Sequence, residues 1–146
     1  FQLTFTPTKT VKAGTKINVD YISRISATGM RYWVVEWYDG DTWVPAFPLQ
    51  TVTVSGKDSP TGQAATVEGE TKTVDVTYNV ELTTATSNTH VNFDAVYTKE
   101  AQEVVVRMRC VSNYTGTANV FASKPTGGTC RIAGAAGTSP VIKTVK

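Results

Sequence analysis

Five acidic residues have the side chains best suited to catalysis of hydrolysis: Glu36, Asp39, Asp41, Asp94 and Glu103. Hydrolysis of a glycosidic bond needs two carboxyl groups that face each other across the bond. A small hydrolase would therefore require two of these side chains in one pocket. All five lie at expected turns or on the solvent side of expected strands, where a carboxylate is normally hydrated. We predict that the protein is not an enzyme.

Metal and cofactor chemistry has few candidate residues. The one histidine, His90, has no partner at a metal-ligand spacing, so zinc would need Cys110, Cys130 and a carboxylate. Asp39 and Asp41 could contribute to a Ca²⁺ site, but two side chains supply fewer than the roughly six to eight oxygens that Ca²⁺ takes. The chain has no nucleophile-elbow or phosphate-loop motif. We expect no cofactor, and Ca²⁺ binding at the acidic turn stays open.

The two cysteines, Cys110 and Cys130, both fall on the apolar phase of their expected strands. Two interpretations remain open. They could be small buried hydrophobic residues, or they could form a disulfide between neighbouring strands in an oxidising compartment.

The composition indicates which elements position these groups. The chain has 146 residues, a length typical of one domain, and we treat residues 1–146 as a single domain. It contains 25 threonines and 20 valines but only three leucines, which is typical of an all-β protein. The net charge of +2 is spread along the chain, which argues against nucleic-acid binding. No apolar run approaches the roughly 18 residues of a membrane-spanning helix.

Alternation of apolar and polar residues predicts strands over 16–23, 31–38, 72–82, 89–97 and 103–111, with shorter strands elsewhere. Turn residues separate them, and the polar segment 55–69 is expected to be an exposed loop. About ten short strands predict a two-sheet antiparallel β-sandwich, for which we prefer a jelly roll to an Ig-like arrangement. The expected core residues are Trp33, Trp37, Val76, Tyr78, Val91, Phe93, Val104, Val106 and Met108.

The segment YWVVEWYDGDTW, residues 32–43, decides which rings could meet a ligand. Trp33 and Trp37 should face the core, because the opposite face carries Glu36 and should be the wetter one. Depending on the turn register, Trp43 lies opposite Tyr38 or opposite Glu36, on the wetter face in both cases. It could form a stacking platform there or be covered by a loop. Arg107 and Arg109 share a strand face with Val105 and Val111, where they are solvated or reach a ligand or an acidic neighbour.

The same segment resembles the strand–turn–strand of jelly-roll carbohydrate-binding modules and galactose-binding-like domains. The later segments VVVRMRCVSNYTGTANVFAS and CRIAGAAGTSPVIKTV resemble the closing strands of secreted β-sandwich modules from Bacteroidetes-type surface proteins. The resemblance covers about half of the chain. It implies an extracellular or cell-surface location within a larger surface protein, and it assigns no ligand-binding residue.

The sequence leads to two hypotheses about function. The leading hypothesis is a non-catalytic module that binds a glycan or polysaccharide. Sugars would stack on Trp43 and Tyr38, with hydroxyl groups bonded by Glu36, Asp39, Asp41 and Arg107. The alternative is a structural or adhesive spacer whose partner is a protein, bound through a sheet edge or an apolar patch.

Overall fold

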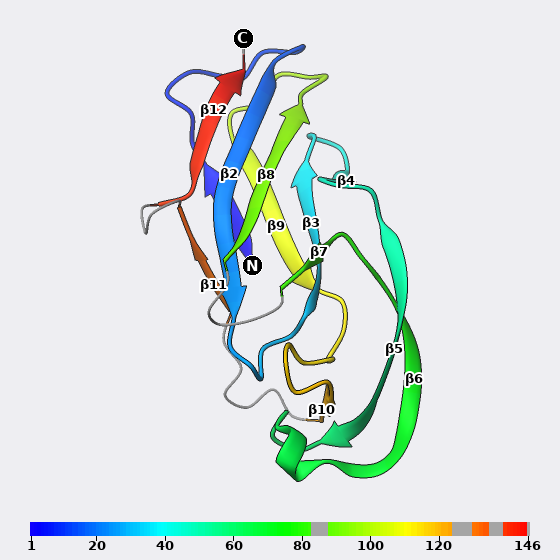
Figure 1. Cartoon of the computed structure of the whole chain (residues 1–146). Coiled ribbons are helices and arrows are strands. Elements are labelled where there is room, and N and C mark those ends of the chain that lie inside the picture. Colours follow the sequence, from blue (N-terminus) through cyan, green and yellow to red (C-terminus); the bar gives the residue numbers. More distant parts are fainter. Residues whose placement is uncertain (83–87, 124–129, 135–138, 146) are drawn as a thin grey trace.

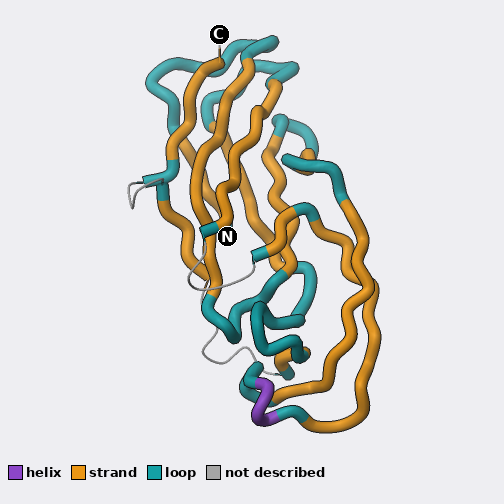
Figure 2. Tube along the Cα trace, viewed as in Figure 1, coloured by secondary structure: helices purple, strands orange, loops and turns teal. Residues whose placement is uncertain are grey.

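A computed structural model describes residues 1–82, 88–123, 130–134 and 139–145, and its regular structure is almost entirely β-strand (Figure 1). The described residues contain no α-helix, only one short 3-10 helix over Ala64–Thr66 (Figure 2). The prediction of an all-β sandwich is confirmed. The preference for a jelly roll over an Ig-like arrangement stays a prediction.

The first sheet is built around β3 (Tyr32–Tyr38). One edge of β3 pairs with β9 (Val104–Cys110), which pairs in turn with β1 (Gln2–Phe5). The other edge pairs with β7 (Val80–Glu81) near the start of β3 and with β4 (Trp43–Pro45) near its end. All of these pairs are antiparallel.

The second sheet is built around β2 (Lys16–Ile25), which pairs with β8 (Thr89–Val96) along one edge. The other edge pairs with β11 (Cys130–Ala133) and β12 (Val141–Val145), one after the other. The alternation in β2 and β8 follows the sequence prediction, with every second side chain buried. Such strands place one face on a core and the other in water.

The main core lies between these two sheets. Trp33 and Trp37 are in it, as predicted, with 8% and 6% of their surfaces exposed. Trp37 packs against Tyr97 with 5.0 Å between ring centroids, and the Trp33 indole N–H donates to the Met30 carbonyl at 2.8 Å. All nine predicted core residues are buried, although Val76 and Tyr78 belong to a second cluster.

A long hairpin, β5 (Gln50–Ser59) and β6 (Glu68–Tyr78), forms a third small sheet with β10 (Phe121–Ala122), to one side of the other two sheets (Figure 1). The predicted loop over 55–69 is therefore wrong at its two ends, because residues 55–59 belong to β5 and residues 68–69 to β6, while residues 60–67 connect the two strands. Polar side chains pair across the hairpin, with Thr53 Oγ1 donating to Asp75 at 2.6 Å and Ser55 Oγ 2.9 Å from Thr73 Oγ1. These cross-strand polar pairs stabilise the hairpin on the face opposite the one that carries Val54 and Val76. The β10–β5 pair is parallel, which also departs from the prediction.

The predicted strand over 72–82 is interrupted at Asn79. The Asn79 amide accepts from the Val35 N–H at 2.7 Å and donates to the Val35 carbonyl at 2.9 Å, so it replaces a strand neighbour at this point of β3. Val80 and Leu82 therefore reach the main core. Val76 and Tyr78 instead join the second cluster, completed by Tyr32, Val54, Tyr114 and Phe121.

Candidate functional site

The turn after β3 settles the register that the sequence left open. Tyr38 pairs with Trp43, and the Asp39 N–H donates to the Thr42 carbonyl at 3.1 Å, so Gly40 and Asp41 are the central turn residues. Gly40 has a φ of 105°, which L side chains rarely adopt. Asp39 Oδ1 accepts the N–H groups of Asp41 and Thr42, each at 2.8 Å. These backbone hydrogen bonds lower the pKa of Asp39 and give its carboxylate a structural role in the turn.

Tyr38 and Trp43 form an aromatic pair on the outer face of the first sheet. Their ring centroids lie 5.3 Å apart with the ring planes tilted by 51°. Both residues are partly exposed, whereas Trp33 and Trp37 are buried. Trp43 is thus the tryptophan that could meet a ligand.

Arg107 reaches this pair across β3. Its guanidinium carbon lies 4.0 Å from the centre of the Trp43 ring, a cation–π arrangement, and its Nε donates to Glu36 Oε2 at 2.6 Å. Glu36 and Arg107 are cross-strand neighbours in the register of β3 and β9. One face of the Trp43 ring is therefore in contact with Arg107 rather than with a covering loop.

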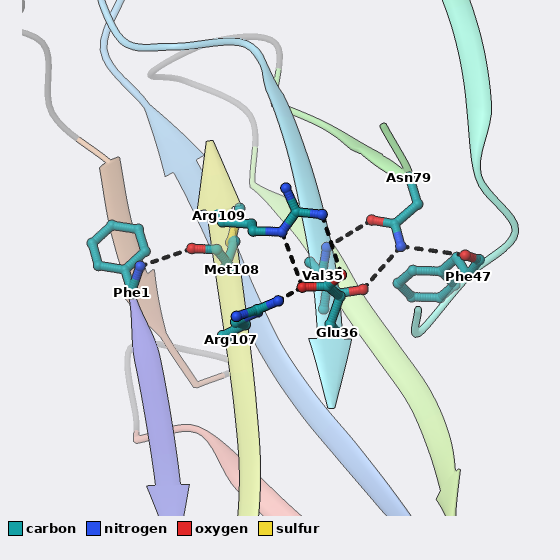
Figure 3. Close-up of polar contacts among 8 residues, drawn as sticks. All are labelled: Phe1, Val35, Glu36, Phe47, Asn79, Arg107, Met108 and Arg109. Carbon is teal, nitrogen blue, oxygen red and sulfur yellow. Dashed lines mark hydrogen bonds and ion pairs between the residues drawn. The ribbon is translucent and has the colours of Figure 1, made fainter. Parts of the chain in front are cut away.

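Glu36 is buried, with 6% of its surface exposed, so the prediction that it lies on a wet face is wrong. The reason is a second arginine. Arg109 donates from Nε to Glu36 Oε2 at 3.1 Å and from Nη2 to Oε1 at 3.3 Å (Figure 3). Burial acts to raise the pKa of Glu36, but the hydrogen bonds from Arg109 and Arg107 outweigh it and hold that pKa below its usual value. We call Glu36, Arg107, Arg109 and Trp43 the Glu36 cluster.

The structure brings four of the six predicted ligand-binding residues together: Tyr38, Trp43, Glu36 and Arg107. Asp39 is engaged in the adjacent turn, and Asp41 forms an exposed ion pair with Lys99. Arg109 was not among the predicted site residues. The sequence feature that could have identified it is its position two residues after Arg107, on the same strand face. Its partner in the structure is an acidic neighbour, Glu36.

A shallow hollow of about 530 Å³ adjoins the turn end of β3. One aromatic ring, Tyr38, borders it, and the rest of its lining is mixed: Thr6, Glu100, Gln102 and Glu103 are polar, whereas Pro7, Ala101 and Val105 are apolar. The sequence pattern did not point to it, because its lining comes from three separate segments.

The five candidate carboxylates have different surroundings. Glu36 pairs with two arginines, Asp39 caps the turn, and Asp41 pairs with Lys99. Asp94 accepts from Asn18 at 2.9 Å, and Glu103 lines the hollow. That the protein is not an enzyme stays a prediction. Among the described residues, no three His, Cys, Asp or Glu side chains lie close enough together to hold a metal ion. His90 is on the surface, where its Nε2 lies 2.6 Å from Asp20 Oδ1.

Both cysteines are free thiols. The prediction that both point into the core is wrong for Cys110, which is exposed, while Cys130 is half-buried. Cys110 is the last residue of β9, where the chain bends and its Sγ donates to the Ser112 carbonyl at 3.0 Å. Although Cys110 is exposed as a residue, neighbouring atoms partly desolvate its sulfur, and desolvation raises the pKa of each thiol.

Within the part of the chain that the structure describes, no helix has the length and hydropathy of a membrane span. No protein-family model, no curated protein and no solved structure matches this chain.

Proposed function

We propose that this protein is a non-catalytic module that binds glycans at the Tyr38–Trp43 pair. The observation that carries the proposal is that these two rings are partly exposed side by side while the other two indoles are buried. A pyranose presents one face of C–H groups, which packs on a flat ring, and a rim of hydroxyls, which needs hydrogen-bonding groups nearby. Arg107 supplies such groups beside Trp43.

The pair is held rigidly, which favours binding because little freedom is lost when the ligand arrives. Tyr38 ends β3 and Trp43 begins β4, and the turn between them is fixed by the Asp39 carboxylate. Arg107 is fixed in turn by Glu36. An extracellular or cell-surface location, within a larger surface protein, accords with this function.

A glycan array followed by titration of the binding polysaccharide tests the proposal. Trp43→Ala should weaken binding by at least about tenfold, the size expected for a central aromatic contact. Trp43→Phe keeps a flat ring and should retain most of the affinity. Val96→Ala, which truncates an exposed apolar residue on the second sheet, is the matched control. An affinity that Trp43→Ala leaves unchanged would remove this site.

The alternative, a structural spacer with a protein partner, is favoured by one observation. β6 is 11 residues long and lies at the edge of its sheet, with most of its residues exposed. Such an edge can accept a strand from another protein. On this hypothesis, Thr71→Pro in β6 would abolish partner binding and Trp43→Ala would leave it intact.

A further inference from the structure

The Glu36 cluster contains more positive than negative charge. Two guanidinium groups, from Arg107 and Arg109, share the single Glu36 carboxylate. Glu36 is itself buried, whereas the side chains of Arg107 and Arg109 are 32% and 50% exposed. The negative partner therefore lies beneath the positive ones, and the surface beside Trp43 presents cations.

Several donors of this cluster have no acceptor in the part of the chain that the structure describes. Arg107 donates to Glu36 only through Nε, and Arg109 only through Nε and Nη2. Among the described residues, Nη1 and Nη2 of Arg107 find no acceptor. The same is true of Nη1 of Arg109. Partly exposed guanidinium N–H groups that are already oriented suit a carboxylate or a sulfate, which they bind through charge-assisted hydrogen bonds.

The neighbouring acidic groups do not neutralise this surface. Asp41 pairs with Lys99, and Asp39 accepts backbone N–H groups within its turn. Glu100 and Glu103 line the hollow at the turn end of β3, whereas Arg107 and Arg109 pair with Glu36 and Val34, earlier in that strand. The Tyr38–Trp43 pair therefore has the cationic Arg107 as a neighbour on the side of Trp43, and the carboxylates of Glu100 and Glu103 as neighbours in the hollow on the side of Tyr38.

We propose that the ligand of this site is an anionic glycan, whose carboxylate or sulfate binds Arg107 and Arg109 while its ring packs on the Tyr38–Trp43 pair. This inference rests on the proposed function and narrows it to a class of sugar. Burial of Glu36 serves to hold the two guanidinium groups in place before the ligand arrives. The stacking of Arg107 on Trp43 then places the charged group next to the aromatic ring.

The test compares acidic polysaccharides with their neutralised forms. Polygalacturonate and alginate are each paired with their methyl esters, and dextran sulfate is paired with dextran. At low salt we expect at least one acidic form to bind ten times more tightly than its neutral partner. Arg107→Gln and Arg109→Gln should each bring the two affinities to within about threefold. Arg131→Gln removes one positive charge from an exposed position on β11 and should leave the preference unchanged.

The two proposals fail differently. If neutral forms bind as tightly as acidic ones and Trp43→Ala weakens both, glycan binding stands and the anionic preference is wrong. A preference that survives both arginine substitutions, or that Arg131→Gln removes equally, reflects general charge attraction and also overturns the inference. If no member of the array or of the pairs binds, both proposals fail.

Folding of the variants is checked by circular dichroism and thermal melting. If both arginine variants are unfolded, the wild-type protein still decides the question. Its affinity is then measured for a series of polygalacturonates with increasing degrees of methyl esterification. Affinity should fall at each step of that series, and a flat series would contradict the inference. Binding to the sulfated or to the carboxylated partner alone supports it and identifies the charged group.

Discussion

Arg107 and Trp43 are in contact although β3 lies between the strands that carry them: the guanidinium carbon is 4.0 Å from the centre of the indole ring. Arg107 is paired in register with Glu36, and Trp43 with Tyr38 two residues further along β3, so the contact between Arg107 and Trp43 is diagonal across the sheet. Glu36 holds it there through a hydrogen bond of 2.6 Å from Arg107 Nε. This contact joins the charged and the aromatic halves of the candidate site into one surface.

The first prediction concerns tryptophan accessibility. Trp43 is partly exposed, whereas only 8% of the surface of Trp33 and 6% of that of Trp37 are exposed. Acrylamide should therefore quench mainly the fluorescence of Trp43. Trp43→Phe should therefore remove most of the quenchable emission, whereas Trp37→Phe should leave the accessible component in place. Quenching that is unchanged in Trp43→Phe would show that the ring is covered.

The second prediction concerns pH and Glu36. Its pKa is lowered in the folded protein, so its ionised form stabilises the fold above its unfolded pKa of about 4.3, and this contribution disappears as the pH falls through the folded pKa. Glu36→Gln should reduce the free energy of unfolding by about 1–3 kcal/mol at pH 7, because it removes the charge that two arginines bind. Below about pH 4 the difference from the wild type should shrink.

Urea denaturation at a series of pH values measures this difference. Glu103→Gln, which changes an exposed carboxylate, is the control and should show a small difference at every pH. A Glu36→Gln difference that stays constant between pH 7 and pH 3 would contradict the prediction.

The third prediction concerns the docking of the β5–β6 hairpin at Gly56. A Cβ atom there would lie 2.7 Å from the Asn119 carbonyl oxygen and 3.2 Å from the Tyr114 ring. Gly56→Ala should lower the free energy of unfolding by about 1–3 kcal/mol, because backbone must move to admit the methyl group. Thr73→Ala, at an exposed position of the same hairpin, should change it by less, about 0.5 kcal/mol, in the same urea experiment.

The fourth prediction concerns the thiols. Native protein should contain two free thiols, and Cys110, the exposed one, should react with a thiol reagent before Cys130. Because burial raises the pKa of both groups, the reaction should be slow at pH 7 and accelerate as the pH rises toward their pKa values. Cys110→Ser should remove the faster phase. A mass that increases by two hydrogens on reduction would reveal a disulfide instead.

Much of the sandwich follows from local pattern. Alternation placed Val104, Val106 and Met108 on the buried side of β9, and it placed Val91 and Phe93 on the buried side of β8. The acidic-glycine composition of the turn limited Trp43 to two registers, and the structure has one of them. Period-two patterning is a property of neighbouring residues, so it can be recognised without knowledge of the fold.

The candidate site depended on contacts between distant residues. Glu36 was expected in water because no local feature showed that Arg107 and Arg109, more than 70 positions away, would pair with it. Tyr32 and Val34, on the same face, are also buried, and Tyr32 packs in the second cluster with Tyr78 and Tyr114.

The sequence by itself determined the all-β class, most of the buried positions and the aromatic turn. The tertiary structure decided which strand faces are covered, where Asn79 divides a strand, and which charges meet at Trp43. The physical reason is that strand patterning records whether a residue prefers water, whereas the burial of a charge depends on partners that only the folded chain brings within hydrogen-bonding distance.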